Sequence, residues 1–362
     1  MISHCFGRCD RRPCLQHERS RMLGGGRRRN IHVRWKYRWT DALGGNRRAI
    51  ALLTLSLLSS VACGSGQRVD PAFRVQLPSP PTYPTASGPV VLIDEAHNNV
   101  AVAAGRYGPF IEVLEADGFV VQSLRTGFTP DSLKDAELLV ITGAMHDRNL
   151  ENWSLLESGN QPAGPEPLLS AFSQQEIEVV NGWVSAGGAL LLLAEHMPMA
   201  GAVAQLAHSF GFTLLNGFVE DPDTWDPAVF RRSDGTLVDH PITRGSGRDA
   251  GVEFVATFDG AAFKADGAET LMILGPQYVS YQPEIIWDID ENTPTISVAG
   301  WFQGAVKRFD AGRIAVFGDA TMFSAQLKEN GSPMGMNSDE GAHNLQFLLN
   351  VMHWLVGSNV EE

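Results

Sequence analysis

Cysteine is absent from most of this 362-residue chain, because its four cysteines, Cys5, Cys9, Cys14 and Cys63, all lie within the first 63 residues. The body of the protein therefore has no internal disulfide, no zinc–thiolate site and no cysteine nucleophile. Positive charge is also scarce there. The first 48 residues hold thirteen Lys or Arg against three acids, and the whole chain carries −13, so the remaining 314 residues carry −23.

This acidic balance excludes two classes of partner. A protein that binds nucleic acid needs a basic face to neutralise phosphates, so we expect no nucleic-acid partner. Anionic lipid head groups would repel the acidic body as well. Attachment to a membrane would therefore require a covalent anchor.

A candidate export signal occupies residues 47–63. Arg47 and Arg48 precede the apolar run 49–62, and Cys63 follows it. The run is too short to cross a bilayer as a helix, which needs about 20 residues, but it is typical of a secretory signal peptide. Residues 60–63 resemble a lipobox, although Ser60 stands where Leu is usual. We predict an acyl anchor on Cys63 that holds an exported protein in the cell envelope, on the periplasmic side of a membrane or at the cell surface; a plain secretory signal is the alternative.

The rest of the chain divides into three parts. Residues 1–46 are rich in arginine and lack periodicity, so we interpret them as a start codon assigned too far upstream or as a disordered stretch. Residues 64–88 are rich in proline, serine and threonine, which is typical of a tether between lipid and domain. Residues 89–357 contain the regular patterns of one folded domain.

Apolar runs and helical spacings alternate along this domain. Apolar runs predict buried strands at 89–94, 137–142, 189–194 and 313–318, and a further strand is predicted at 119–124. Helical spacing and capping residues predict helices at 107–117, 173–186, 200–210 and 340–356. Residues 145–170 are interpreted as a loop, and residues 219–301 as an irregular β-rich insertion. The alternation predicts an α/β fold with a doubly wound, mostly parallel sheet.

Polar residues follow the predicted strands, at the edge where such sheets bind ligands. We expect a cleft there that takes a small polar ligand. The binding candidates are Asp94, Glu95, His97, Asn98, Thr321, Ser324, Asn337, Glu340, His343 and Asn344. Glu340, His343 and Asn344 would share one face of the closing helix, since positions i, i+3 and i+4 are neighbours.

The same edge admits a chemical and a structural interpretation. Glu195, His196 and Asp319 are the candidates for acid–base catalysis. Asp94, His97 and His196 are the candidates for binding a divalent metal, the one cofactor that we consider. In the structural interpretation, Asp94 and Asp319 cap nearby backbone N–H groups and the amides join loops.

Several short motifs occur in an order that resembles a known superfamily. They are D-E-A-H-N-N at 94–99, H-P-I-T-R-G at 240–245, G-D-A-T-M-F at 318–323, and the closing set Asn344, Phe347, Asn350, Trp354 and Leu355. In this order the chain resembles an uncharacterised bacterial branch of the class I glutamine-amidotransferase-like superfamily. The resemblance implies a flavodoxin-like fold.

The resemblance also implies that this chain lacks the catalytic residues of the family. In active amidotransferases a cysteine occupies a sharp turn after a strand, and the matching turn here, residues 194–196, has no thiol. The His-x-Glu pair of the family would fall near Asp319, where the chain reads Gly-Asp-Ala-Thr. We therefore expect no glutamine hydrolysis. Two functions stay open: a non-catalytic domain that binds a small polar ligand, a glycan or an envelope protein, and a metal- or acid–base-dependent hydrolase.

Overall fold

The computed structural model describes residues 67–100, 105–245 and 250–358. The predicted signal at 47–63, the lipidation site Cys63 and the basic segment 1–46 lie outside these residues. Within the described ranges, no helix combines the length and apolarity that crossing a membrane requires.

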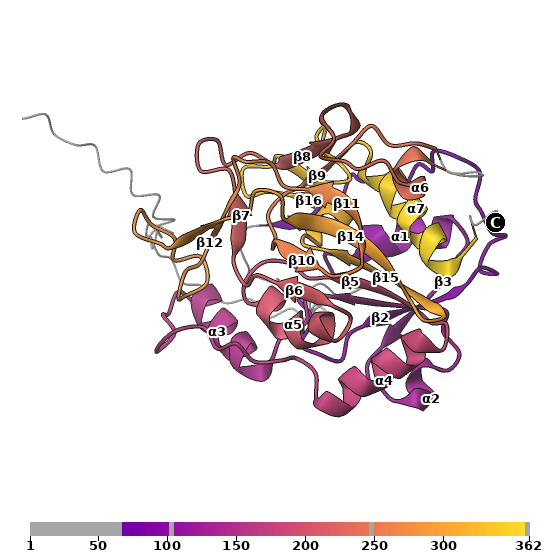
Figure 1. Cartoon of the computed structure of the whole chain (residues 1–362), viewed down its shortest axis with the longest axis horizontal. Coiled ribbons are helices and arrows are strands. Elements are labelled where there is room, and N and C mark those ends of the chain that lie inside the picture. The colour runs from indigo at the N-terminus through magenta and orange to yellow at the C-terminus, as the bar shows by residue number, and fades with distance from the viewer. Residues whose placement is uncertain (1–66, 101–104, 246–249, 359–362) are drawn as a thin grey trace, which may run out of the picture. The chain divides into compact units, whose positions relative to one another are not determined.

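A nine-stranded sheet forms the centre of the domain (Figure 1). Five adjacent strands are parallel, in the order β3 (Val120–Leu124), β2 (Val90–Asp94), β4 (Leu138–Thr142), β5 (Ala189–Leu193) and β15 (Gly312–Phe317). The sheet continues with antiparallel strands β14 (Phe302–Phe309), β10 (Phe263–Ala265) and β6 (Phe212–Leu214), and β11 (Glu269–Ile273) also pairs with β14. The sheet is therefore mixed, with its parallel half built from the predicted apolar runs.

The inner parallel strands are largely apolar because both faces of the sheet are covered, and β5 is apolar at every position. Leu191 and Leu193 of β5 belong to one buried cluster, and Leu190 and Leu192 belong to the other. Side chains alternate between the two faces of a strand, so a run without polar residues indicates burial on both sides.

Helices cover both faces of this parallel half (Figure 1). On one face lie α1 (Gly108–Ala116) and α7 (Asn344–Val356). On the other lie α2 (Pro130–Leu133), α4 (Gln174–Ser185) and α5 (Met199–Ser209). The predicted capping box starts α4: Oγ of Ser173 accepts from the backbone N–H of Glu176, and the Glu176 carboxylate accepts from that of Ser173.

Smaller elements surround the carboxyl edge of the parallel strands. They include the helices α3 (Asp147–Glu157) and α6 (Pro241–Arg244) and the 3₁₀ turns η1 (Arg232–Asp234) and η2 (Thr321–Phe323). Two small sheets have three strands each: one contains β13 (Thr295–Ser297), β12 (Val279–Tyr281) and β7 (Phe218–Glu220), and the other β1 (Arg68–Val69), β16 (Ala325–Leu327) and β17 (Pro333–Gly335). A third small sheet pairs β8 (Ala228–Arg231) with β9 (Phe254–Thr257).

Three expectations from the sequence differ from the structure. Residues 145–170 are not simply a loop, because α3 forms there with Leu150, Trp153 and Leu156 on its packed side. The closing helix begins at Asn344 and not at residue 340, because residues 339–343 form turns. The described part of the expected tether, residues 67–88, lies against the domain: β1 pairs with β16, and Phe73, Val75, Leu77 and Tyr83 pack on the core. These apolar side chains, set among the prolines, account for the packing.

Candidate functional site

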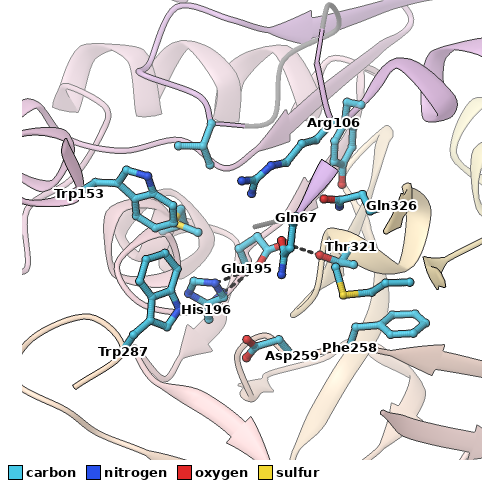
Figure 2. Close-up of a pocket in the computed structure, with 14 residues that line it drawn as sticks. Gln67, Arg106, Trp153, Glu195, His196, Phe258, Asp259, Trp287, Thr321 and Gln326 are labelled. Atoms are coloured by element: carbon cyan, nitrogen blue, oxygen red, sulfur yellow. Dashed lines mark hydrogen bonds and ion pairs between the residues drawn. The ribbon is translucent and has the colours of Figure 1, made fainter. Parts of the chain in front are cut away.

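A cavity of about 100 Å³ opens at the carboxyl edge of the parallel strands (Figure 2). Glu195 and His196 enter it directly after β5, and Thr321 enters after β15. Arg106 reaches it from just before α1, and Asp259 from just after β9. The cavity therefore lies where open α/β sheets bind their ligands.

Glu195 holds an unusual backbone conformation at the turn that follows β5. Its φ is 59°, in the left-handed region that costs a residue with a side chain about 1 kcal/mol. Its Oε1 accepts from the backbone N–H of Ala320 at 3.2 Å and from Oγ1 of Thr321 at 3.4 Å. The strained turn thus places a carboxylate in the cavity and joins the ends of β5 and β15. Strain of this kind is concentrated at functional sites.

His196 presents one ring nitrogen to the cavity. Its Nδ1 lies 2.6 Å from the backbone carbonyl oxygen of Met197, so this nitrogen carries the proton and donates it. In the neutral ring Nε2 is then a hydrogen-bond acceptor, and it lies 3.8 Å from Oε2 of Glu195. The ring stacks on Phe218 with centroids 4.6 Å apart, and only 8% of the residue is exposed. The imidazole is therefore fixed in place.

Two indole rings form one wall of the cavity. Trp287 lies edge-on to His196, with centroids 6.0 Å apart, and edge-on to Trp153, with centroids 4.7 Å apart. Figure 2 shows the two indoles beside His196, on the side away from Thr321. Nε1 of Trp153 donates to Glu157 at 2.7 Å, which fixes that ring. This wall offers apolar and π surface next to charged groups.

The charges around the cavity are mainly negative. Burial raises the pKa of Asp259 to about 6; His196 opposes the rise and Glu195 adds to it. Burial also raises the pKa of Glu220, at the end of β7, to about 9, and the charge of Asp259 contributes. Burial lowers the pKa of Arg106, an effect that Glu195 and Glu157 oppose. Burial is therefore the main cause of the raised carboxyl pKa values, and neighbouring carboxyl groups add to it.

Asp319 lies behind the cavity and holds the backbone. Its Oδ2 accepts from the N–H groups of Phe258 and Met322, at 2.9 and 3.1 Å, and its Oδ1 accepts from that of Thr321 at 2.8 Å. Burial and the charge of Glu195 raise its pKa well above the usual range, although these donors oppose the rise. The structural interpretation fits Asp319, which is fully buried and positions Thr321.

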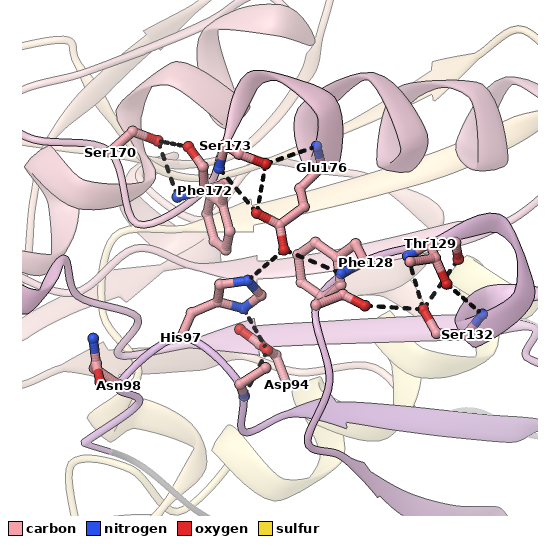
Figure 3. Close-up of polar contacts among 12 residues, drawn as sticks. Asp94, His97, Asn98, Phe128, Thr129, Ser132, Ser170, Phe172, Ser173 and Glu176 are labelled. Atoms are coloured by element: carbon pink, nitrogen blue, oxygen red, sulfur yellow. Dashed lines mark hydrogen bonds and ion pairs between the residues drawn. The ribbon is translucent and has the colours of Figure 1, made fainter.

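Asp94 and His97 form a second cluster with Glu176 (Figure 3). Nδ1 of His97 lies 2.8 Å from Oδ1 of Asp94, and its Nε2 lies 3.1 Å from Oε1 of Glu176. The ring packs against Phe128 and Phe172, with centroids 4.6 and 4.8 Å away. Both ring nitrogens are satisfied within the fold, so this cluster joins the end of β2 to the start of α4.

The two carboxylates determine the ionisation of the cluster. Burial lowers the pKa of His97, but the carboxylates of Asp94 and Glu176 outweigh it, and the net shift is upward. The pKa of Glu176 falls to about 2, because hydrogen bonds from Ser173 and His97 outweigh the opposing effect of burial. His97 therefore favours the charged form, between two acids.

Other predicted candidates connect loops. Glu95 pairs with Arg125, with its Oε2 2.9 Å from Nε, and Nδ2 of Asn98 donates to Asp147 at 2.8 Å. Oγ of Ser324 accepts from Gln326 at 2.7 Å, and Nδ2 of Asn337 donates to Asp70 at 3.0 Å. These side chains are held by other parts of the fold.

The three candidates near the closing helix do not share a helical face. Glu340 lies in a turn before α7 and is exposed. His343 stacks on Phe254, with centroids 4.4 Å apart, and its Nδ1 accepts from the backbone N–H of Glu253. Asn344 is fully buried and donates to the carbonyl oxygens of Ala256 and Met322. The expected common direction fails because the helix begins four residues later than the pattern indicates.

The three metal candidates are divided between the two clusters. Asp94 and His97 contact each other, whereas His196 lines the cavity. Among the described residues, no group of three His, Cys, Asp or Glu is placed to hold a metal ion. The arrangement suits acid–base or hydrogen-bonding chemistry better than metal coordination.

Sequence reasoning missed most of the cavity wall, because only Glu195, His196 and Thr321 among its lining residues were candidates. Arg106, Trp153, Asp259 and Trp287 were not among the candidates, and neither was Gln67, which also lines the cavity. None of them directly follows a parallel strand. Only Asp259 had a recognisable signal in the sequence: it follows a strand and precedes Gly260, as polar residues in turns often do.

The chain was compared with known proteins. No family model matches it, and no curated protein matches it. Among solved structures, the mmIFT52 N-terminal domain matches with a TM-score of 0.51 at 15% identity, over 75% of this chain and 100% of that domain. A ThuA-like protein from Bacteroides uniformis matches with a TM-score of 0.43 at 13% identity, over 77% of this chain and 96% of the other. A cytoplasmic protein from Salmonella typhimurium LT2 matches at 0.42 and 13%, over 74% and 98%. The first likeness shows a shared fold.

Proposed function

We propose that this protein is a binding domain of the cell envelope, whose cavity at the carboxyl ends of β5 and β15 takes a small polar ligand without chemical change. We infer further that the fold is flavodoxin-like and related to the glutamine amidotransferases, because its five parallel strands have the spatial order 2-1-3-4-5. The observation that carries the proposal is the turn at Glu195, which holds a carboxylate where an amidotransferase would hold its thiol nucleophile.

The lipid anchor is part of this proposal and rests on the sequence at 47–63. Gln67 lines the cavity only four residues after Cys63. Four extended residues span at most about 14 Å. An acyl chain on Cys63 would therefore keep the cavity close to the membrane surface, and the ligand would be collected there.

A hydrolase is the second candidate, and one observation favours it. Burial raises the pKa of Asp259 to about 6, and the charge of Glu195 in the same cavity adds to the rise. A buried carboxyl group with a raised pKa, next to a second carboxyl group, is a common arrangement for general acid–base catalysis.

The experiment is a screen of the full chain against sugars, amino sugars, amines and amino acids. Tryptophan fluorescence would report binding, because Trp153 and Trp287 line the cavity. We expect at least one compound to change the fluorescence saturably, to lose this effect in Glu195→Gln, and to be recovered unaltered after long incubation. Cleavage of the compound would favour the hydrolase, and no binder would overturn the proposal.

A further inference from the structure

Two acceptors that line the cavity face each other without a shared donor. Nδ1 of His196 donates to Met197, so Nε2 is an acceptor in the neutral ring, and the residue is more than nine-tenths buried. Among the described residues, Oε2 of Glu195 accepts only from the backbone N–H of His196, at 3.4 Å, and the 3.8 Å between Oε2 and Nε2 exceeds hydrogen-bond length. Within the part of the chain that the structure describes, Nε2 has no hydrogen-bond donor. Two buried acceptors that face each other indicate a place for a donor from outside.

Asp259 adds a third acceptor. Its Oδ1 accepts from the backbone N–H of Gly260 at 2.7 Å, and its Oδ2 makes no hydrogen bond with the described residues. Asp259 is also close enough to feel the charge of Glu195, and it acts in turn on Glu220 and Asp319. The opposing charges are His196 on Asp259, Lys328 on Glu220 and Arg106 beside Glu195. A ligand that brings positive charge would offset this excess of carboxyl groups.

The two indole rings favour an organic cation over a metal ion. Trp287 and Trp153 line the cavity beside His196 (Figure 2). Indole faces attract ammonium groups through their quadrupole. A metal ion would need three or more protein ligands at about 2.0–2.6 Å, and the described residues offer no such group. The cavity, at about 100 Å³, has room for a small head group.

We propose that the cavity binds an organic cation, an alkylammonium head group that lies against Trp287 and Trp153 and is held by Glu195, Asp259 and Nε2 of His196. This inference rests on the proposed function and names the chemical class of its ligand. A primary ammonium would donate to the three acceptors together. A quaternary ammonium would use the indoles and the carboxylate charge alone.

The test uses methylammonium and tetramethylammonium chloride on the full chain at pH 8, with sodium chloride and glucose as matched additions. We expect both ammonium ions to quench tryptophan fluorescence saturably and to show saturation transfer by NMR, and sodium chloride and glucose to do neither. Glu195→Gln and Asp259→Asn should each weaken binding about tenfold or more, because each removes a charge-assisted contact.

The control is Glu178→Gln, which removes the same charge from an exposed site on α4 that does not line the cavity, and it should bind like the natural protein. Circular dichroism would show that each variant folds, and NMR on the ligand protons does not depend on the tryptophans. Binding of glucose without binding of ammonium ions would overturn the inference and leave the proposed function standing. Ammonium binding that both cavity variants retain, or no ammonium binding at all, would also overturn it.

Discussion

His97 and His196 both follow a parallel strand of the same sheet, but their surroundings differ. His97 has a carboxylate at each ring nitrogen and two phenyl rings packed against it. His196 has a backbone carbonyl at one nitrogen and the cavity at the other. A histidine whose two nitrogens are satisfied within the fold stabilises the fold. A histidine with an open nitrogen is available to a ligand.

The largest expected effect comes from removing the satisfied histidine. His97→Ala leaves Asp94 and Glu176 without their shared cation, and losing one member of a buried ionic cluster costs about 3 kcal/mol or more. His196→Ala, the matched variant, loses a ring stack worth about 1 kcal/mol. Urea unfolding would measure both free energies of unfolding. Equal losses would show that the two histidines do not differ in this way.

The stability lost in His97→Ala should also depend on pH. The pKa of His97 is raised in the fold, so its contribution is complete below about 6.5 and is lost as pH rises through the raised value. Glu176, with its pKa lowered to about 2, contributes above its usual value and loses this contribution as pH falls. The gap between the natural protein and His97→Ala should therefore be widest between these limits. Thermal melts across pH would measure it, and a constant gap would contradict the ionic account.

A smaller effect is expected where negative charge is in excess. The pKa of Glu220 is raised from 4.5 to about 9 on folding, so its contribution to stability is complete below 4.5 and is lost progressively as pH rises from there to 9. Glu220→Gln should stabilise the protein at pH 8 by about 1 kcal/mol, with allowance for solvent screening of a partly exposed group. The gain should vanish at pH 4. Urea unfolding at both pH values would measure it, and an equal gain from Glu178→Gln would attribute it to net charge.

The smallest effect isolates the strained turn at Glu195. Glu195→Ala and Glu195→Gly both remove the carboxylate, so their difference reports the backbone alone. Because φ is 59°, the glycine variant should be more stable than the alanine variant by about 1 kcal/mol. Paired unfolding curves would show it. If alanine proves as stable as glycine, the turn is not strained.

The predictable part of the fold was the part with local signals. Four apolar runs and the further strand predicted at 119–124 gave the parallel strands, and Ser173 with Glu176 gave the start of α4. The same reasoning found Glu195 and His196, because they directly follow an apolar run. A charged residue in that position must be satisfied by the fold or exposed to a site.

The missed part depends on tertiary packing. Glu176 contacts His97 although 79 positions of the chain separate them. Asp259 and Trp287 line the same cavity as Glu195 because the antiparallel elements between β5 and β15 bring them there. No spacing rule connects such residues. The metal candidates Asp94 and His97 lie in a different cluster from His196 for the same reason, because neighbouring strand ends can direct their side chains to different places.

The pairing of β1 with β16 has a practical consequence. It brings Gln67 to the cavity, whereas Gly357 follows α7 beside Arg313, at the opposite edge of the sheet where β15 begins. A purification tag or fluorophore fused shortly before residue 67 would stand at the cavity mouth and interfere with titrations. A tag or fluorophore fused after α7 would leave the cavity mouth clear. The protein should therefore be immobilised through its C-terminal side when ligands are to be captured.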